Sequence, residues 1–102
     1  MKQIERITKM ETILDTGNAL AQSVLQALSE FEENIPEYNL LVSYYESNKW
    51  RKDFEDDEKG LLPEDLKRGV LSEDGIYNLI EMHQEIYDLM EKILATKNDT
   101  SA

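Results

Sequence analysis

The sequence predicts an all-α protein of one domain, folded as an antiparallel three-helix bundle. Apolar residues recur at alternating spacings of three and four in separate segments, which is the period of amphipathic helices. The 102-residue chain contains 4 Gly and 2 Pro, too few for the many tight turns of an all-β fold. Hydrophobic residues make up 40% of the chain, enough for one core. We expect the domain to cover residues 1–95 and a flexible tail to cover 96–102.

The first predicted helix covers residues 2–33. Gly17 lies inside its apolar stripe and costs about 1 kcal/mol relative to alanine, so a kink at this position is one alternative. Asn34 and Pro36 then predict a boundary, because proline suits the first turn of a helix but not its interior. The stripe contains Ile7, Met10, Leu14, Gly17, Ala21, Val24, Leu28, Phe31 and Ile35.

The second predicted helix covers residues 37–58, with a bend expected at Ser47. Gly60 favours an end at this point, because glycine readily adopts the left-handed conformation that closes a helix. Residues 59–72 form a structured connection.

The third predicted helix covers residues 73–95, and Ser72 is its expected N-cap. Its apolar seam includes His83, the only histidine of the chain. Because the chain has no cysteine and one histidine, it cannot form a histidine-rich or Cys/His metal site of the usual kinds. We therefore interpret His83 as a packed, hydrogen-bonded residue of the seam. The seam contains Ile76, Leu79, His83, Ile86, Met90 and Ile93.

The charge pattern excludes several classes of partner. The chain holds 22 acids and 11 bases, for a formal net charge of -11, and no Lys or Arg occurs between Met10 and Asn48. Without clustered cations, direct binding to nucleic acid or to an anionic membrane surface is disfavoured. Glu5 stands where a signal peptide would have its apolar stretch, so we expect a cytoplasmic protein.

Leu14 with the tripeptide Asp15-Thr16-Gly17 matches the signature of aspartic proteases. That chemistry needs two such aspartates sharing a proton on loops between strands. Here the tripeptide lies inside a helical repeat, so we interpret Asp15 as a surface residue of a helix.

An acidic run between Asp53 and Glu58 resembles part of a calcium-binding loop. Glu58 stands where such a loop needs glycine for its sharp turn, so we expect no metal site and no cofactor. Salt bridges to nearby bases are the favoured interpretation. The acids at the loop spacing are Asp53, Glu55, Asp57 and Glu64.

Four acids are expected on the outer face of the third helix. They are open to two interpretations: a mimic of nucleic-acid phosphates, or the polar face that any bundle helix shows to water. These acids are Asp74, Glu81, Glu85 and Asp88.

The block 44–77 is unusually rich in aromatic and charged residues for a connection. Its segments Tyr44–Ser47, Trp50–Glu55 and Leu62–Tyr77 resemble a bacterial family of roughly 100-residue proteins known as domain of unknown function forty-two ninety-eight. The resemblance covers residues 1 to about 94. It implies a bacterial, helical, stand-alone protein, and it transfers no catalytic residue because the family has no assigned activity.

The same block holds the candidate functional residues. One interpretation is a small structural cap over the end of the bundle, in which Arg68 binds a carboxylate such as Asp53 or Asp57. The other is a patch that binds a partner. The residues concerned are Tyr45, Trp50, Asp53, Phe54, Asp57 and Arg68.

These observations predict a non-catalytic protein–protein interaction or regulatory module that binds another protein and forms a homodimer. The first helix is expected to outrun its neighbours by about 15 Å, which leaves apolar residues without an intrachain partner. Two alternatives stay open: an acidic decoy for a DNA- or RNA-binding protein, and a small carboxylate- or metal-dependent enzyme. We expect no enzymatic activity.

Overall fold

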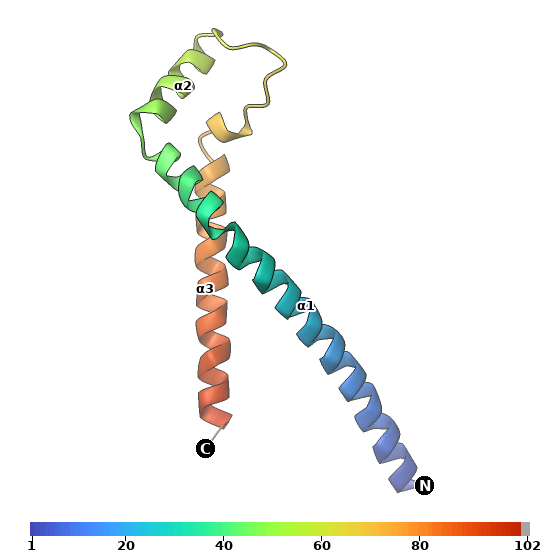
Figure 1. Ribbon diagram of the computed structural model, residues 1–102. Coiled ribbons are helices and arrows are strands. Elements are labelled where there is room, and N and C mark those ends of the chain that lie inside the picture. Colours follow the sequence, from blue (N-terminus) through green and yellow to red (C-terminus); the bar gives the residue numbers. More distant parts are fainter. Residues whose placement is uncertain (101–102) are drawn as a thin grey trace. The chain divides into compact units, whose positions relative to one another are not determined.

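The computed structural model describes residues 1–100, and in that range it contains helices and no strand (Figure 1). The prediction of an all-α protein is thereby confirmed. The elements in chain order are α1 (Lys2–Tyr45), α2 (Asn48–Glu58), a short 3-10 helix η1 (Gly69–Leu71) and α3 (Gly75–Thr100).

The chain divides into two compact units, which we call the N-terminal unit (Met1–Tyr38) and the C-terminal unit (Asn39 onward). Apart from Met1, the N-terminal unit consists of α1 residues alone, so it is a single helix. The C-terminal unit contains the last turns of α1 together with α2, η1 and α3.

The predicted helix boundary at Asn34 and Pro36 is wrong, because α1 runs through both residues to Tyr45. Proline inside a helix removes one N–H and strains the preceding turn, at a cost of about 3 kcal/mol. The apolar spacing of three and four continues past it and favours one helix. The residues that continue it are Ile35, Tyr38, Val42 and Tyr45.

The break between α1 and α2 falls at Ser47, where the sequence predicted a bend. The Ser47 hydroxyl donates a hydrogen bond to the Tyr44 carbonyl at 2.6 Å and accepts one from the Trp50 N–H at 3.3 Å. Ser47 thus ends one helix and caps the next. The second helix therefore begins at Asn48, not at residue 37.

The end of α2 follows the prediction made for Gly60. Gly60 has φ +73°, and its N–H donates to the Asp57 carbonyl at 3.0 Å. The Leu61 N–H donates to the Asp56 carbonyl at 3.0 Å, which completes a Schellman closure.

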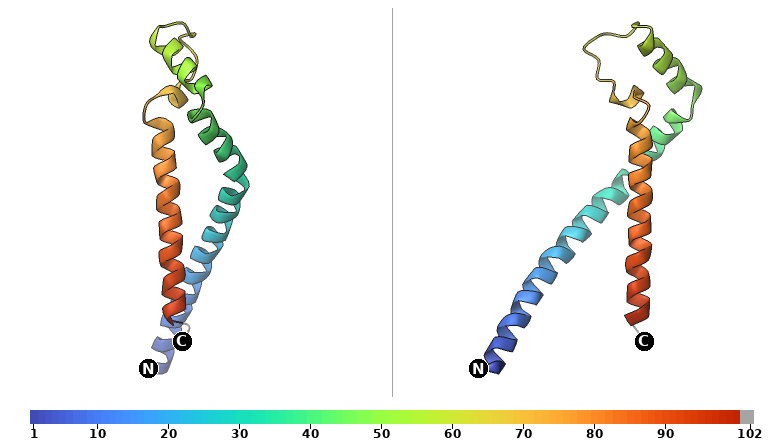
Figure 2. Two further views of the ribbon diagram at one scale, coloured as in Figure 1. Left: turned by 90° about the vertical axis from the view of Figure 1, so that its left-hand side faces the viewer. Right: turned by 180° about the vertical axis from the view of Figure 1, so that it is seen from behind.

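The connection then leads back to α3, as the two views of Figure 2 show. Ser72 accepts a hydrogen bond at 3.0 Å from the N–H of Gly75, the first residue of α3, so its predicted capping role is confirmed. The helix itself begins at Gly75, two residues later than the expected residue 73, because residues 73 and 74 form a turn. The expected end at Ala95 is five residues early, because α3 continues to Thr100 through a segment without glycine or proline. Residues 101–102 of the expected tail lie outside the described residues.

Burial is concentrated in the C-terminal unit. Leu71, Ile76 and His83 are the buried side chains among residues 1–97, and η1 contacts both α2 and α3. Within the N-terminal unit the stripe of α1 is largely exposed. The antiparallel bundle stays a prediction. No helix in the described part of the chain has the length and apolar character needed to cross a membrane.

Candidate functional site

Trp50 joins the first turn of α2 to the connection. Its ring stacks on Phe54 with centroids 5.1 Å apart and meets the edge of Tyr45 at the same distance. Its indole Nε1 donates a hydrogen bond to the Val70 carbonyl at 2.9 Å. One side chain therefore links the end of α1, the body of α2 and η1.

Arg68 makes the corresponding link at the far end of α2. Its guanidinium donates to the Asp57 carboxylate and to the Pro63 carbonyl, and its Nε donates to the Leu66 carbonyl at 3.3 Å. The Asp57 side chain is 19% exposed and that of Arg68 is 36% exposed, so this ion pair is partly shielded from water. The three acceptors suit the fixed fork of a guanidinium.

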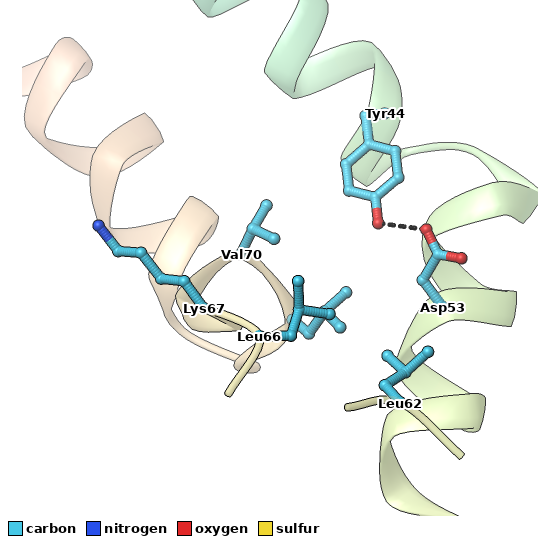
Figure 3. A pocket seen from close by; sticks show the side chains of 7 residues that line it. Tyr44, Asp53, Leu62, Leu66, Lys67 and Val70 are labelled. Atoms are coloured by element: carbon cyan, nitrogen blue, oxygen red, sulfur yellow. Dashed lines mark hydrogen bonds between the residues drawn. The ribbon is translucent and has the colours of Figure 1, made fainter. Parts of the chain in front are cut away.

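Asp53 lies between these two links and has a different partner. Its carboxylate accepts a hydrogen bond from the Tyr44 hydroxyl at 2.6 Å, drawn as a dashed line in Figure 3. Burial, followed by this hydrogen bond and the negative charge of Asp53, raises the pKa of Tyr44 to about 12. The hydroxyl thus stays protonated at neutral pH and acts as a donor to Asp53.

The Tyr44–Asp53 pair forms the polar edge of a cavity of about 320 Å³. The rest of the lining is mostly apolar, and the Lys67 ammonium points away from the pair (Figure 3). Asp57 and Glu64, which the sequence grouped with Asp53 by loop spacing, are not in the lining, so Asp53 supplies its carboxylate. The lining residues are Tyr44, Asp53, Leu62, Leu66, Lys67, Val70 and Leu71.

The acidic run lies on α2, not in a loop, so its carboxylates are distributed around a helix. Asp56 pairs with Lys52 at 3.1 Å, while Asp53 and Asp57 bind Tyr44 and Arg68. Within the described residues, no three His, Cys, Asp or Glu side chains gather in a way that could hold a metal ion.

The structure places all six candidate residues in the C-terminal unit, and five of them fall in two groups. Tyr45, Trp50 and Phe54 form one aromatic cluster, and Asp57 with Arg68 forms the ion pair. Asp53 joins neither group, because Tyr44 binds it.

Sequence reasoning missed Tyr44 and Gly75. Tyr44 stands nine residues before Asp53, and only the break at Ser47 brings the two together. Gly75 lies against η1, where an added Cβ would be 2.6 Å from the Gly69 carbonyl oxygen. No local sequence signal marks that contact.

The acids proposed as a phosphate mimic are exposed along α3 and just before it. Asp88 accepts a hydrogen bond from Gln84 at 2.9 Å, one helical turn away. A polar outer face of a helix accounts for this pattern.

The fold and its site define a small helical protein whose aromatic cluster and ion pair hold a short helix against a structured connection. The family model described as Domain of unknown function (DUF4298) matches residues 7–93. The chain belongs to this family, which confirms the resemblance found in the sequence. Neither the curated proteins nor the solved structures contain a match to the chain.

Proposed function

We propose that the chain is a non-catalytic protein–protein interaction module that forms a homodimer through the apolar stripe of its N-terminal unit. The observation that supports this proposal is the exposure of that stripe. Ile7, Met10, Leu14 and Val24 are 52%, 51%, 55% and 53% exposed. A row of exposed apolar side chains along one helix is typical of a surface that a protein partner covers.

Helix lengths add a second argument. α1 has 44 residues and α3 has 26, so α3 can accompany α1 over at most its own length. At least 18 residues of α1, about 27 Å at helical rise, would then still lack a neighbour. The antiparallel bundle expected from the sequence is part of this proposal, and it leaves the same residues of α1 without a neighbouring helix.

The hydrophobic effect supplies the free energy for pairing two chains through this stripe. Burying one Leu, Ile or Met side chain completely is worth about 1.5–3 kcal/mol. The free energy gained by burying several such residues along α1 can exceed the entropic cost of associating two chains. A symmetric second copy is the commonest partner for such a face.

The polar groups of the C-terminal unit favour a structural role over catalysis. Asp53 and Asp57 are bound by Tyr44 and Arg68 within the chain, and a tyrosine with a raised pKa is a poor acid or base at neutral pH. We therefore propose that the module works by binding alone, in the cytoplasm of its cell.

The test is the concentration dependence of the melting temperature at moderate salt, where repulsion between two chains of net charge -11 is screened. A self-associating chain melts at higher temperature as its concentration rises. Leu14→Glu should abolish this dependence, while Gln22→Glu, which adds the same charge outside the stripe, should preserve it. A melting temperature independent of concentration in the unmodified chain would overturn the proposal.

A further inference from the structure

The N-terminal unit carries its apolar stripe as two alternating columns, and Ile4, Ile13, Leu20 and Leu25 lie on the flanks of this stripe. Each column repeats every seven residues, which is the period of helices that pair side by side in a left-handed coiled coil. A second helix of the same period is the partner that this face fits. The first column contains Ile7, Leu14, Ala21, Leu28 and Ile35, and the second contains Met10, Gly17, Val24, Phe31 and Tyr38.

We propose that two copies of the chain pair their N-terminal units antiparallel, with Gly17 of each copy opposite Ala21 of the other. This inference rests on the proposed self-association and adds its direction and its register. The two-fold axis then passes beside Ala19, midway between Gly17 and Ala21.

The small residues at this centre support the register. Gly17 destabilises a helix interior by about 1 kcal/mol relative to alanine. A Cβ added at Gly17 would meet nothing within 4 Å among the described residues 1–100, so no contact in that part of the chain requires a glycine there. Opposite Ala21 of a second copy, the missing side chain lets the two backbones approach closely.

The neighbouring layers then pair large side chains with large ones. In antiparallel helices a residue of one column faces a residue of the other column. Counting outward from the centre places Leu14 opposite Val24 and Met10 opposite Leu28. These four side chains are 40–55% exposed in the chain, so each has surface to bury in the pairing.

Charge determines the direction of the pairing. Residues 2–11 hold three bases and two acids, while residues 30–37 hold four acids and no base. Parallel helices would place the acidic ends of both copies together, which is repulsive. Antiparallel helices place Lys2, Arg6 and Lys9 of one copy near the acidic segment of the other, which is attractive.

The flanking residues exclude a shift by one heptad. One shift places Glu11 of each copy beside Glu32 of the other, so two like-charge pairs form at the edge of the interface. The opposite shift places Leu28 of each copy opposite Gln3 of the other and leaves Phe31 of both copies beyond the paired region. The register centred at Ala19 avoids both costs.

The first experiment uses disulfide exchange, because the natural chain has no cysteine. Full-length Met10→Cys and Leu28→Cys are mixed in equal amounts in a glutathione buffer, and the linked dimers are separated by mass. The antiparallel register predicts that the mixed disulfide greatly exceeds its statistical share of one half. A statistical mixture, or an excess of the two like disulfides, would overturn the proposed direction.

The second experiment leaves the stripe intact. It therefore does not depend on how Met10→Cys and Leu28→Cys affect association. Spin labels are attached to Thr8→Cys or to Gln22→Cys, both outside the stripe and at equivalent heptad positions. The register predicts axial separations between the two copies of about 33 Å at residue 8 and about 9 Å at residue 22. Pulsed electron resonance should therefore give a clearly longer distance for the Thr8 label.

The outcomes separate this inference from the proposed function. Equal distances at the two labels would mean parallel pairing, and an axial component of about 44 Å at Thr8 would mean a shifted register. Either result overturns the inference while self-association stands. A melting temperature independent of concentration overturns both.

Discussion

The indole Nε1 of Trp50 donates a hydrogen bond to the carbonyl of Val70 at 2.9 Å across 20 residues of sequence. This bond and the Arg68–Asp57 ion pair hold the two ends of α2 against the connection. The connection therefore depends on a few polar links as well as on a small apolar core.

Replacing Trp50 separates its hydrogen bond from its packing. Trp50→Phe keeps an aromatic ring beside Phe54 but leaves the Val70 carbonyl without its donor, so we expect a loss of about 1 kcal/mol in the free energy of unfolding. Trp50→Ala also removes the ring contacts and should cost more. Denaturant unfolding measures both losses, and an unchanged midpoint for Trp50→Ala would contradict a structural role and favour a binding role.

Replacing Arg68 tests the ion pair. Arg68→Ala should lower the free energy of unfolding by about 1–2 kcal/mol, because the partly buried Asp57 carboxylate and two carbonyls lose their donors. Arg68→Lys should recover only part of the loss, since an ammonium lacks the planar fork. Arg51→Ala removes the same charge from an exposed position of α2 and serves as the control. Equal melting temperatures for Arg68→Ala and Arg51→Ala would show that the ion pair is not structural.

The Tyr44–Asp53 hydrogen bond predicts a loss of stability at alkaline pH. The folded chain raises the pKa of Tyr44 from 10.0 to about 12. The stabilisation of the folded chain by this hydrogen bond is therefore complete below pH 10, and it is lost as the pH rises through 12. The difference in melting temperature between the natural chain and Tyr44→Phe should shrink over this interval. A difference that stays constant from about pH 8 to pH 12 would contradict the assignment.

Gly75 is expected to tolerate no side chain. A Cβ there would lie 2.6 Å from the Gly69 carbonyl oxygen and 2.7 Å from the Ser72 hydroxyl, so Gly75→Ala must displace η1 or the start of α3. We expect a loss of about 1–3 kcal/mol, measured by thermal unfolding. Gly69→Ala is the control, because a Cβ at that position meets nothing within 4 Å in the described part of the chain. Similar melting temperatures for the two variants would refute the close contact.

Local signals predicted the helix ends correctly where a single residue decides the geometry. Ser72 caps α3, and Gly60 closes α2 with a positive φ, because both effects depend on neighbours in sequence. The boundary at Pro36 was wrong because a local rule was given more weight than the apolar spacing, which continues through Tyr38 and Val42.

Contacts between distant segments were predicted less completely. The sequence indicated that Arg68 would bind a carboxylate, but it did not distinguish Asp53 from Asp57. That choice depends on the break at Ser47, which directs Tyr44 to Asp53. The contact between Gly75 and Gly69 depends on the path of the whole connection, so no pattern of spacing reveals it.

Self-association through the N-terminal unit is the central claim, and sedimentation equilibrium of the full chain tests it most directly. The chain mass is 11.9 kDa. At moderate salt and tens of micromolar protein, we predict a mass of two chains that falls toward one chain on dilution. A mass of one chain over the whole concentration range would contradict the account.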